Sequence, residues 1–125
     1  MQEKKADNKI NESKIEIDKI DNKIAVSKEA IKNLDYIEDC LISLNKNLST
    51  CIELLGTSMK GKKSNAILSK SDETRMISIK KSLSTIEQSR ENEKNKIKKY
   101  NEYRDKLENQ LKEQEKEESE DNKEQ

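Results

Sequence analysis

Apolar residues recur along the chain at alternating intervals of three and four positions, with one interruption near the middle. In the first half they lie at Ile17, Ile20, Ile24, Ile31, Leu34, Ile37, Leu41, Leu44, Leu48, Cys51 and Leu55, with Ser27 in the one gap. A period near 3.5 residues is typical of the narrow seam of a coiled coil. Two successive steps of three between Ile31 and Ile37 predict a phase shift that overwinds the supercoil locally.

The second half carries a still more regular row. Its positions are Met76, Ile79, Leu83, Ile86, Arg90, Glu93, Ile97, Tyr100, Arg104, Leu107 and Leu111. Arg90, Glu93 and Arg104 bring charge into this row, and a buried charge is costly unless it is paired. Either these residues meet opposite charges on a neighbouring helix and fix its register, or they reach out to water at a thin seam.

Proline is absent, and the only two glycines, Gly56 and Gly61, both lie at the interruption. Because proline breaks helices and glycine weakens them, this distribution predicts two long helices and one reversal. We expect an all-α fold with two antiparallel helices joined by a short central turn, which is a helical hairpin with a coiled-coil-like seam. Gly56 suits the position that ends the first helix after Leu55, and Ser64 or Ser69 suits the cap that starts the second.

The expected organisation is therefore one hairpin domain over residues 1–125. Its predicted parts are a first helix at about 8–55, a turn at 56–70, a second helix at about 71–116 and an acidic, disordered tail at 117–125.

Seven further apolar residues lie outside the two rows and cluster toward the turn. They are Tyr36, Ile42, Ile52, Leu54, Ile67, Leu68 and Ile77. An apolar face wider than a two-helix seam needs another helix to cover it. We therefore predict a partner-binding surface on the turn-proximal half, covered by a helical protein or by a second copy of this chain.

Composition narrows the classes of function. Only 30% of residues are apolar, so the chain cannot enclose a broad core, and a lone two-helix seam is marginal against chain entropy. A net charge of zero argues against general nucleic-acid binding. No stretch approaches the ~18 apolar residues of a membrane span, so no insertion into a membrane is expected. With no histidine and no metal-ligand spacing, we expect no enzyme activity, no metal and no cofactor.

The two cysteines, Cys40 and Cys51, lie about 16 Å apart along one predicted helix, which is too far for an intrachain disulfide. Both occupy the apolar stripe, so we expect them to be small core residues.

The segment from Ser58 to Ile67 resembles the central turn of the small helical-hairpin proteins of bacterial type VII secretion. Their two helices are joined by a W-x-G motif, and Met59-Lys60-Gly61 stands at that place here, with Ala66 and Ile67 downstream. The plan of two long arms and a central turn is also similar. Within this group the chain looks like the α-helical accessory proteins encoded beside LXG-domain toxins.

This resemblance implies a non-enzymatic, chaperone-like targeting protein that binds the helical N-terminal region of an LXG toxin and promotes secretion of the toxin. A second small helical protein is a further partner that it allows. It also implies a cytoplasmic protein, or one exported with its cargo without a cleavable signal peptide. Two other functions remain open: a self-associating coiled-coil scaffold of the phage or cytoskeletal type, and an antitoxin that masks a toxin.

Overall fold

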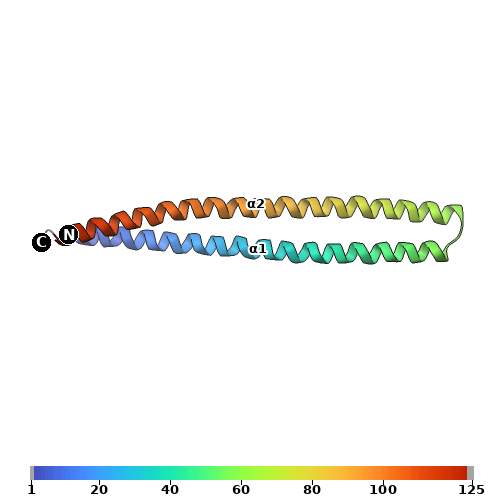
Figure 1. The fold of residues 1–125 in the computed structure, drawn as a ribbon, viewed down its shortest axis with the longest axis horizontal. Helices are drawn as coiled ribbons and strands as arrows, with labels where there is room; N and C mark the ends of the chain where they lie inside the picture. Colours follow the sequence, from blue (N-terminus) through green and yellow to red (C-terminus); the bar gives the residue numbers. More distant parts are fainter. Residues whose placement is uncertain (1, 124–125) are drawn as a thin grey trace. The chain divides into compact units, whose positions relative to one another are not determined.

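A computed structural model describes the backbone of residues 2–123 and the side chains of residues 7–119. Two helices, α1 (Gln2–Ser58) and α2 (Lys62–Lys123), make up almost all of this part of the chain, which contains no strand (Figure 1). The predicted all-α helical hairpin is confirmed.

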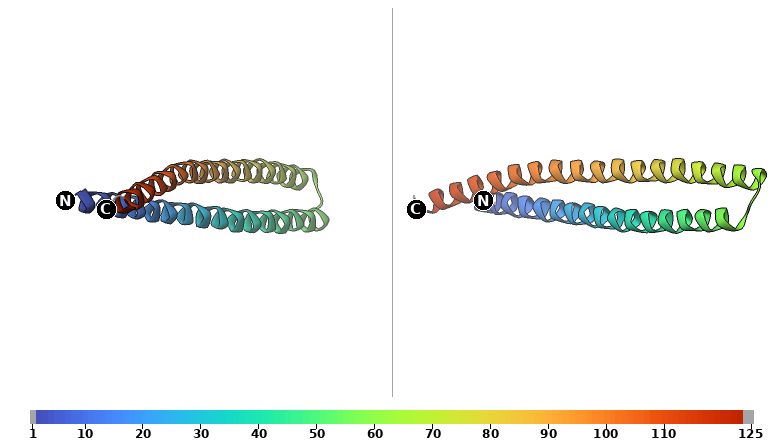
Figure 2. Two further views of the ribbon diagram at one scale, coloured as in Figure 1. Left: turned by 60° about the vertical axis from the view of Figure 1, so that its left-hand side comes forward. Right: turned by 45° about the vertical axis from the view of Figure 1, so that its right-hand side comes forward.

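The hairpin divides into two compact units. The terminal unit combines the segment that ends at Ala30 with the segment that begins at Glu93, and the turn unit spans Ile31–Asn92. Within each unit, a piece of α1 and a piece of α2 lie side by side, as the views in Figures 1 and 2 agree in showing.

The terminal unit contains a continuous apolar seam. Ile17, Ile20, Ile24 and Leu107 form its buried cluster, and Ile97, Tyr100 and Leu111 pack against that cluster. The seam extends beyond the predicted row, because Ile10 and Ser13 are buried as well, and the Ser13 hydroxyl lies 3.3 Å from Oε1 of Gln114. Ser27 is buried, as its place in the gap of the row suggests.

The helices extend past their predicted bounds. The first begins at Gln2 and ends at Ser58, so Gly56 lies inside α1 and does not end it. The second begins at Lys62, so the turn is much shorter than the predicted 56–70, and neither Ser64 nor Ser69 caps it. The tail predicted to be disordered is helical as far as Lys123, and residues 124–125 lie outside the described part.

Three residues, Met59-Lys60-Gly61, connect the helices. The Met59 amide donates a hydrogen bond of 2.8 Å to the Leu55 carbonyl, and the Asn65 amide donates one of 3.0 Å to the Gly61 carbonyl. Gly61 thus holds the cap position of α2, where its carbonyl accepts the first bond of the helix. Its φ angle of 150° is one that residues with a side chain rarely adopt.

The two glycines are therefore expected to respond in opposite ways to alanine. Gly56 is helical and a Cβ there would meet no atom within 4 Å, so Gly56→Ala should stabilise the chain by about 0.5–1 kcal/mol. Gly61→Ala should destabilise it by about 1–2 kcal/mol, because alanine is strained at a positive φ. Urea unfolding followed by circular dichroism tests both, and a shift of the same sign for both variants would contradict these roles.

The predicted seam is correct for α2. On α1 in the turn unit it is correct at Ile31, Leu34 and Leu41, which are half-buried, and wrong at the other five positions of the row. On α2, every position of the row from Ile79 to Leu111 is buried or half-buried, and only Met76 is exposed. On α1 beyond Leu34 the covered positions are Glu38, Leu41, Asn45, Ser49 and Ile52. They lie beside the predicted row of Ile37, Leu44, Leu48, Cys51 and Leu55, all of which are exposed.

Polar side chains occupy part of the α1 face that meets α2 here. Arg90 on α2 bonds to Asp35 and Glu38 on α1, and Arg75 on α2 donates to Oδ1 of Asn45. Glu38 and Asn45 are therefore directed toward α2, and helical periodicity then directs the neighbouring apolar row elsewhere. The covered positions Ile31, Leu34, Glu38, Leu41 and Asn45 keep alternating steps of three and four, so the contact face of α1 stays in phase and the predicted phase shift beyond Ile31 is wrong.

Candidate partner-binding surface

One row of large apolar side chains on α1 faces neither α2 nor any other part of the turn unit. We call Ile37, Leu44, Leu48, Cys51 and Leu55 the open row. The exposed fractions of its four large side chains are 50% for Ile37, 51% for Leu44, 40% for Leu48 and 46% for Leu55, and Cys51 is exposed as well. Steps of seven, four, three and four residues place all five on one face of the helix over about 27 Å.

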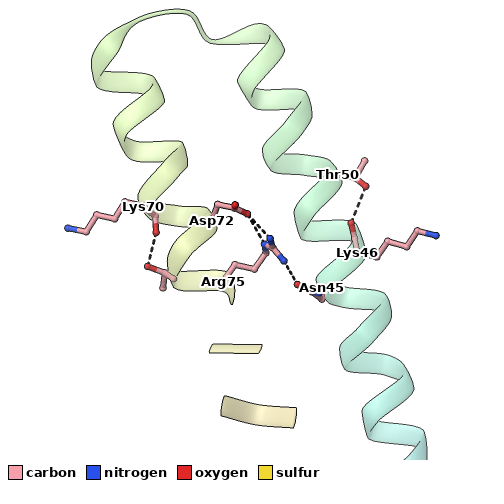
Figure 3. Close-up of polar contacts among 7 residues, drawn as sticks. Asn45, Lys46, Thr50, Lys70, Asp72 and Arg75 are labelled. Carbon is pink, nitrogen blue, oxygen red and sulfur yellow. Dashed lines mark hydrogen bonds and ion pairs between the residues drawn. The ribbon is translucent and has the colours of Figure 1, made fainter. Parts of the chain in front are cut away.

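The open row lies in an unusually uncharged part of the chain. Charged residues make up 42% of the sequence, but residues 40–59 contain only Lys46 and Glu53. These two are seven positions apart and share a face of α1 on the far side from the open row. In Figure 3 the Lys46 side chain points away from α2. The open row is thus flanked by uncharged side chains, a composition that suits contact with another helix better than contact with water.

Exposed large apolar side chains are concentrated in the turn unit. Eleven of them lie there, at Tyr36, Ile37, Ile42, Leu44, Leu48, Leu54, Leu55, Met59, Ile67, Met76 and Ile77. Only Ile15, Val26 and Tyr103 are exposed in the described part of the terminal unit. The terminal unit thus covers its own apolar side chains, whereas the turn unit leaves many uncovered.

The seven residues predicted from the sequence to bind a partner do not share one face. Tyr36, Ile42, Leu54, Ile67 and Ile77 are exposed, whereas Ile52 and Leu68 are half-buried. Ile52 lies one heptad beyond Asn45, which contacts α2 through Arg75, so its position belongs to the interhelical seam. Tyr36 and Leu54 flank the open row, and Ile42 lies on the opposite flank of α1. The sequence pattern missed the open row because its residues fit the seam equally well.

A second apolar surface lies on α2. An open groove of about 500 Å³ is lined by Asn45, Arg75, Met76, Ile77, Ile79, Lys80 and Leu83. Figure 3 shows Arg75 extending from α2 toward α1, between Asp72 and Asn45, and its Nη2 lies 2.6 Å from Oδ1 of Asp72. Arg75 is thus held by neighbours on both helices, next to the exposed side chains of Met76 and Ile77.

The three charged residues of the α2 row all have partners. Arg90 Nε lies 3.0 Å from Oδ1 of Asp35, and the guanidinium also bonds to Glu38 and Glu87. The hydrogen bond to Glu38 and the nearby carboxylates raise the pKa of Arg90. The sequence left two alternatives for Arg90, namely pairing with opposite charges on a neighbouring helix or reaching out to water. The structure shows the first, since Arg90 contacts acids of α1.

Arg104 repeats the arrangement in the terminal unit. Its Nε lies 2.6 Å from Oδ1 of Asp21 on α1, and Nη1 bonds to Glu108 on its own helix. The hydrogen bond to Asp21 raises the pKa of Arg104. Because each arginine contacts particular acids of α1, a slip of one helix along the other by one turn would separate these charges.

Glu93 lies between Ser27 of α1 and Lys96 of its own helix. The Ser27 hydroxyl donates to the Glu93 carboxylate, and Lys96 Nζ lies 3.1 Å from Oε1. These two partners lower the pKa of Glu93 below its ordinary value of 4.5. Glu93 therefore favours the folded state when it is ionised.

This pKa shift predicts a pH dependence. A carboxyl group with a lowered pKa in the folded state contributes stability above pH 4.5, and the contribution is lost as the pH falls below 4.5 toward the folded-state value. Glu93→Gln should therefore lose less stability than the unmodified chain on acidification over that range. Urea unfolding across the range measures this. Glu91→Gln, at an exposed position without an ion pair, serves as the control and should follow the unmodified chain.

The two cysteines are free and exposed, so the expectation that they are small core residues is wrong. Within the described residues there is no cluster of three or more histidine, cysteine, aspartate or glutamate side chains that could hold a metal ion. Neither helix, over its described length, has a segment apolar enough to cross a membrane.

No known protein family matches this chain, and no similar curated protein or solved structure was found.

Proposed function

We propose that the chain is a non-enzymatic accessory protein that adds its helices to the helical N-terminal region of an LXG-type toxin and promotes secretion of that toxin by a type VII system. The observation that carries the proposal is the open row. A 27 Å row of half-exposed leucine and isoleucine side chains at heptad spacing fits the seam of another helix.

The free energy of burial favours such a partner. Completely burying a leucine or isoleucine side chain is worth about 1.5–3 kcal/mol, so covering what remains exposed of four such residues contributes several kcal/mol. In the terminal unit the same residue types are already buried between α1 and α2. The turn unit is therefore the half of the hairpin that gains most from a third or fourth helix.

The turn supports the type VII part of the proposal. Met59-Lys60-Gly61 forms the whole connection between α1 and α2, which is the place that W-x-G holds in the proteins that the chain resembles. Gly61 has the positive φ that favours glycine. Met59 is exposed at the turn, where an apolar side chain is available to a partner.

Co-expression tests the proposal. The chain is produced alone and together with the helical N-terminal region of an LXG toxin encoded beside it, and each sample is analysed by size-exclusion chromatography with light scattering. We expect a complex of defined stoichiometry in the second sample, and less toxin in the culture medium of a strain that lacks this chain. Failure to form a complex, or a stable homodimer that ignores the toxin, would refute the proposal, and the homodimer would favour a self-associating scaffold.

A further inference from the structure

The outer face of α2 in the turn unit carries a second heptad pattern of a different kind. At steps of four and three residues it presents Lys63, Ile67, Lys70, Thr74, Ile77 and Lys81, all of which are exposed. We call these residues the basic stripe. Figure 3 shows the Lys70 side chain pointing away from α1, which places the stripe on the side opposite the interhelical seam.

The charge around the stripe is strongly one-sided. Residues 60–81 contain seven basic residues and only two acidic ones, Asp72 and Glu73. Asp72 is already paired with Arg75, whereas the lysines of the stripe make no ion pair. Ile67 and Ile77 are exposed at 65% and 61% between these lysines. A long helical face that combines free lysines with isoleucine suits an interface that is both anionic and apolar.

We infer that the basic stripe adsorbs to the surface of an anionic lipid bilayer, with α2 lying along the headgroups. Each lysine near such a surface raises the affinity of the chain for the bilayer about fivefold. The isoleucine side chains are buried at the boundary between the headgroups and the acyl chains. The lysine stems can extend along the surface while the ammonium groups reach phosphate. Adsorption of this kind needs no membrane-spanning segment.

The acidic end of another copy of the chain is a poorer occupant. Residues 113–125 hold seven acidic residues and two lysines but contain no apolar residue that could cover Ile67 or Ile77. A lipid surface supplies the negative charge and the apolar phase together. The stripe is also on α2, away from the open row of α1, so this inference stands or falls separately from toxin binding.

Vesicle flotation of the full chain tests the inference. The chain should bind phosphatidylglycerol vesicles, should not bind phosphatidylcholine vesicles, and should bind more weakly as salt rises. Lys63→Glu/Lys70→Glu/Lys81→Glu should weaken binding at least about 100-fold, from the loss of three lysine contacts. The matched control, Lys94→Glu/Lys98→Glu/Lys106→Glu, makes the same change in net charge at exposed lysines of the terminal unit and should bind nearly as the unmodified chain does.

Ile67→Ser/Ile77→Ser tests whether the apolar side chains contribute to adsorption beyond charge attraction, and it should also weaken binding. Circular dichroism checks that each variant keeps its helices. The inference fails if the unmodified chain does not bind phosphatidylglycerol, if the two lysine variants lose binding equally, or if the isoleucine variant binds normally. A synthetic amphipathic peptide of glutamate and leucine is tested in parallel. Binding to that peptide without binding to vesicles would overturn the inference in favour of an acidic protein partner.

Discussion

Aspartate at both Leu44 and Leu48 is expected to weaken binding of the proposed partner, the helical region of an LXG toxin, at least about 100-fold, the effect of losing two central anchors of an interface. The two side chains lie in the middle of the open row and are about half exposed in the free chain. A partner helix that covers them would have to bury two carboxylates without a counter-charge, since the flanking positions are uncharged. The free hairpin should lose only about 1 kcal/mol, because neither residue lies in its seam.

Isothermal titration or co-purification measures the binding, and urea unfolding measures the stability of the same proteins. Ser43→Asp/Thr50→Asp is the matched control, with the same two added charges at exposed positions of α1 that lie off the open row. It should bind as the unmodified chain does. Equal binding by the Leu44/Leu48 variant and this control would mean that the open row is not the interface.

The largest effect on stability is expected in the terminal unit, at Ile20. This residue is only 4% exposed and belongs to the cluster of Ile17, Ile24 and Leu107. Ile20→Ala leaves a cavity within this cluster, so it should cost about 2–3 kcal/mol. Thermal unfolding followed by circular dichroism would show this loss as a lower midpoint.

Ile15→Ala provides the control for Ile20→Ala on the same helix. Ile15 is 54% exposed, and alanine has the higher helix propensity, so the change should alter stability by no more than about 0.5 kcal/mol. If the two substitutions had equal effects, the buried cluster would not be what stabilises the terminal unit.

The hairpin could be predicted from the sequence because local signals agree with one another. The heptad spacing, the absence of proline and the confinement of glycine all indicate two helices and one turn. The α2 row follows its heptad pattern because its polar members, Arg90, Glu93 and Arg104, find partners without leaving the seam. Periodicity alone was enough to predict the α2 row, because its polar residues form their contacts from positions within the seam.

The α1 side of the turn unit could not be predicted in the same way. Leu44 and Leu48 continue an apolar period that fits a seam. The face of α1 that meets α2, however, carries Glu38 and Asn45, which contact Arg90 and Arg75. These contacts depend on the register between the two helices, which no local pattern reveals. Apolar spacing identified an apolar stripe on α1 but did not reveal that α2 leaves it exposed.

The helix bounds were missed for a related reason. Gly56 reads as a helix stop, yet a single glycine inside a long helix costs only about 1 kcal/mol, which the surrounding turns of α1 offset. Gly61 was placed correctly in the turn, and its positive φ shows why glycine serves there.

The central claim is that a partner helix covers the open row, and Cys51 lies within that row as a built-in probe. The measurement is the rate of maleimide modification of Cys51 in a Cys40→Ser chain, alone and in complex with the toxin's helical region. We predict rapid modification of the free chain and a rate at least about tenfold lower in the complex, because the thiol is shielded. In a Cys40→Ser/Cys51→Ser/Thr50→Cys control, the thiol off the row should react equally fast in both states. A complex in which Cys51 reacts as fast as in the free chain would contradict the claim.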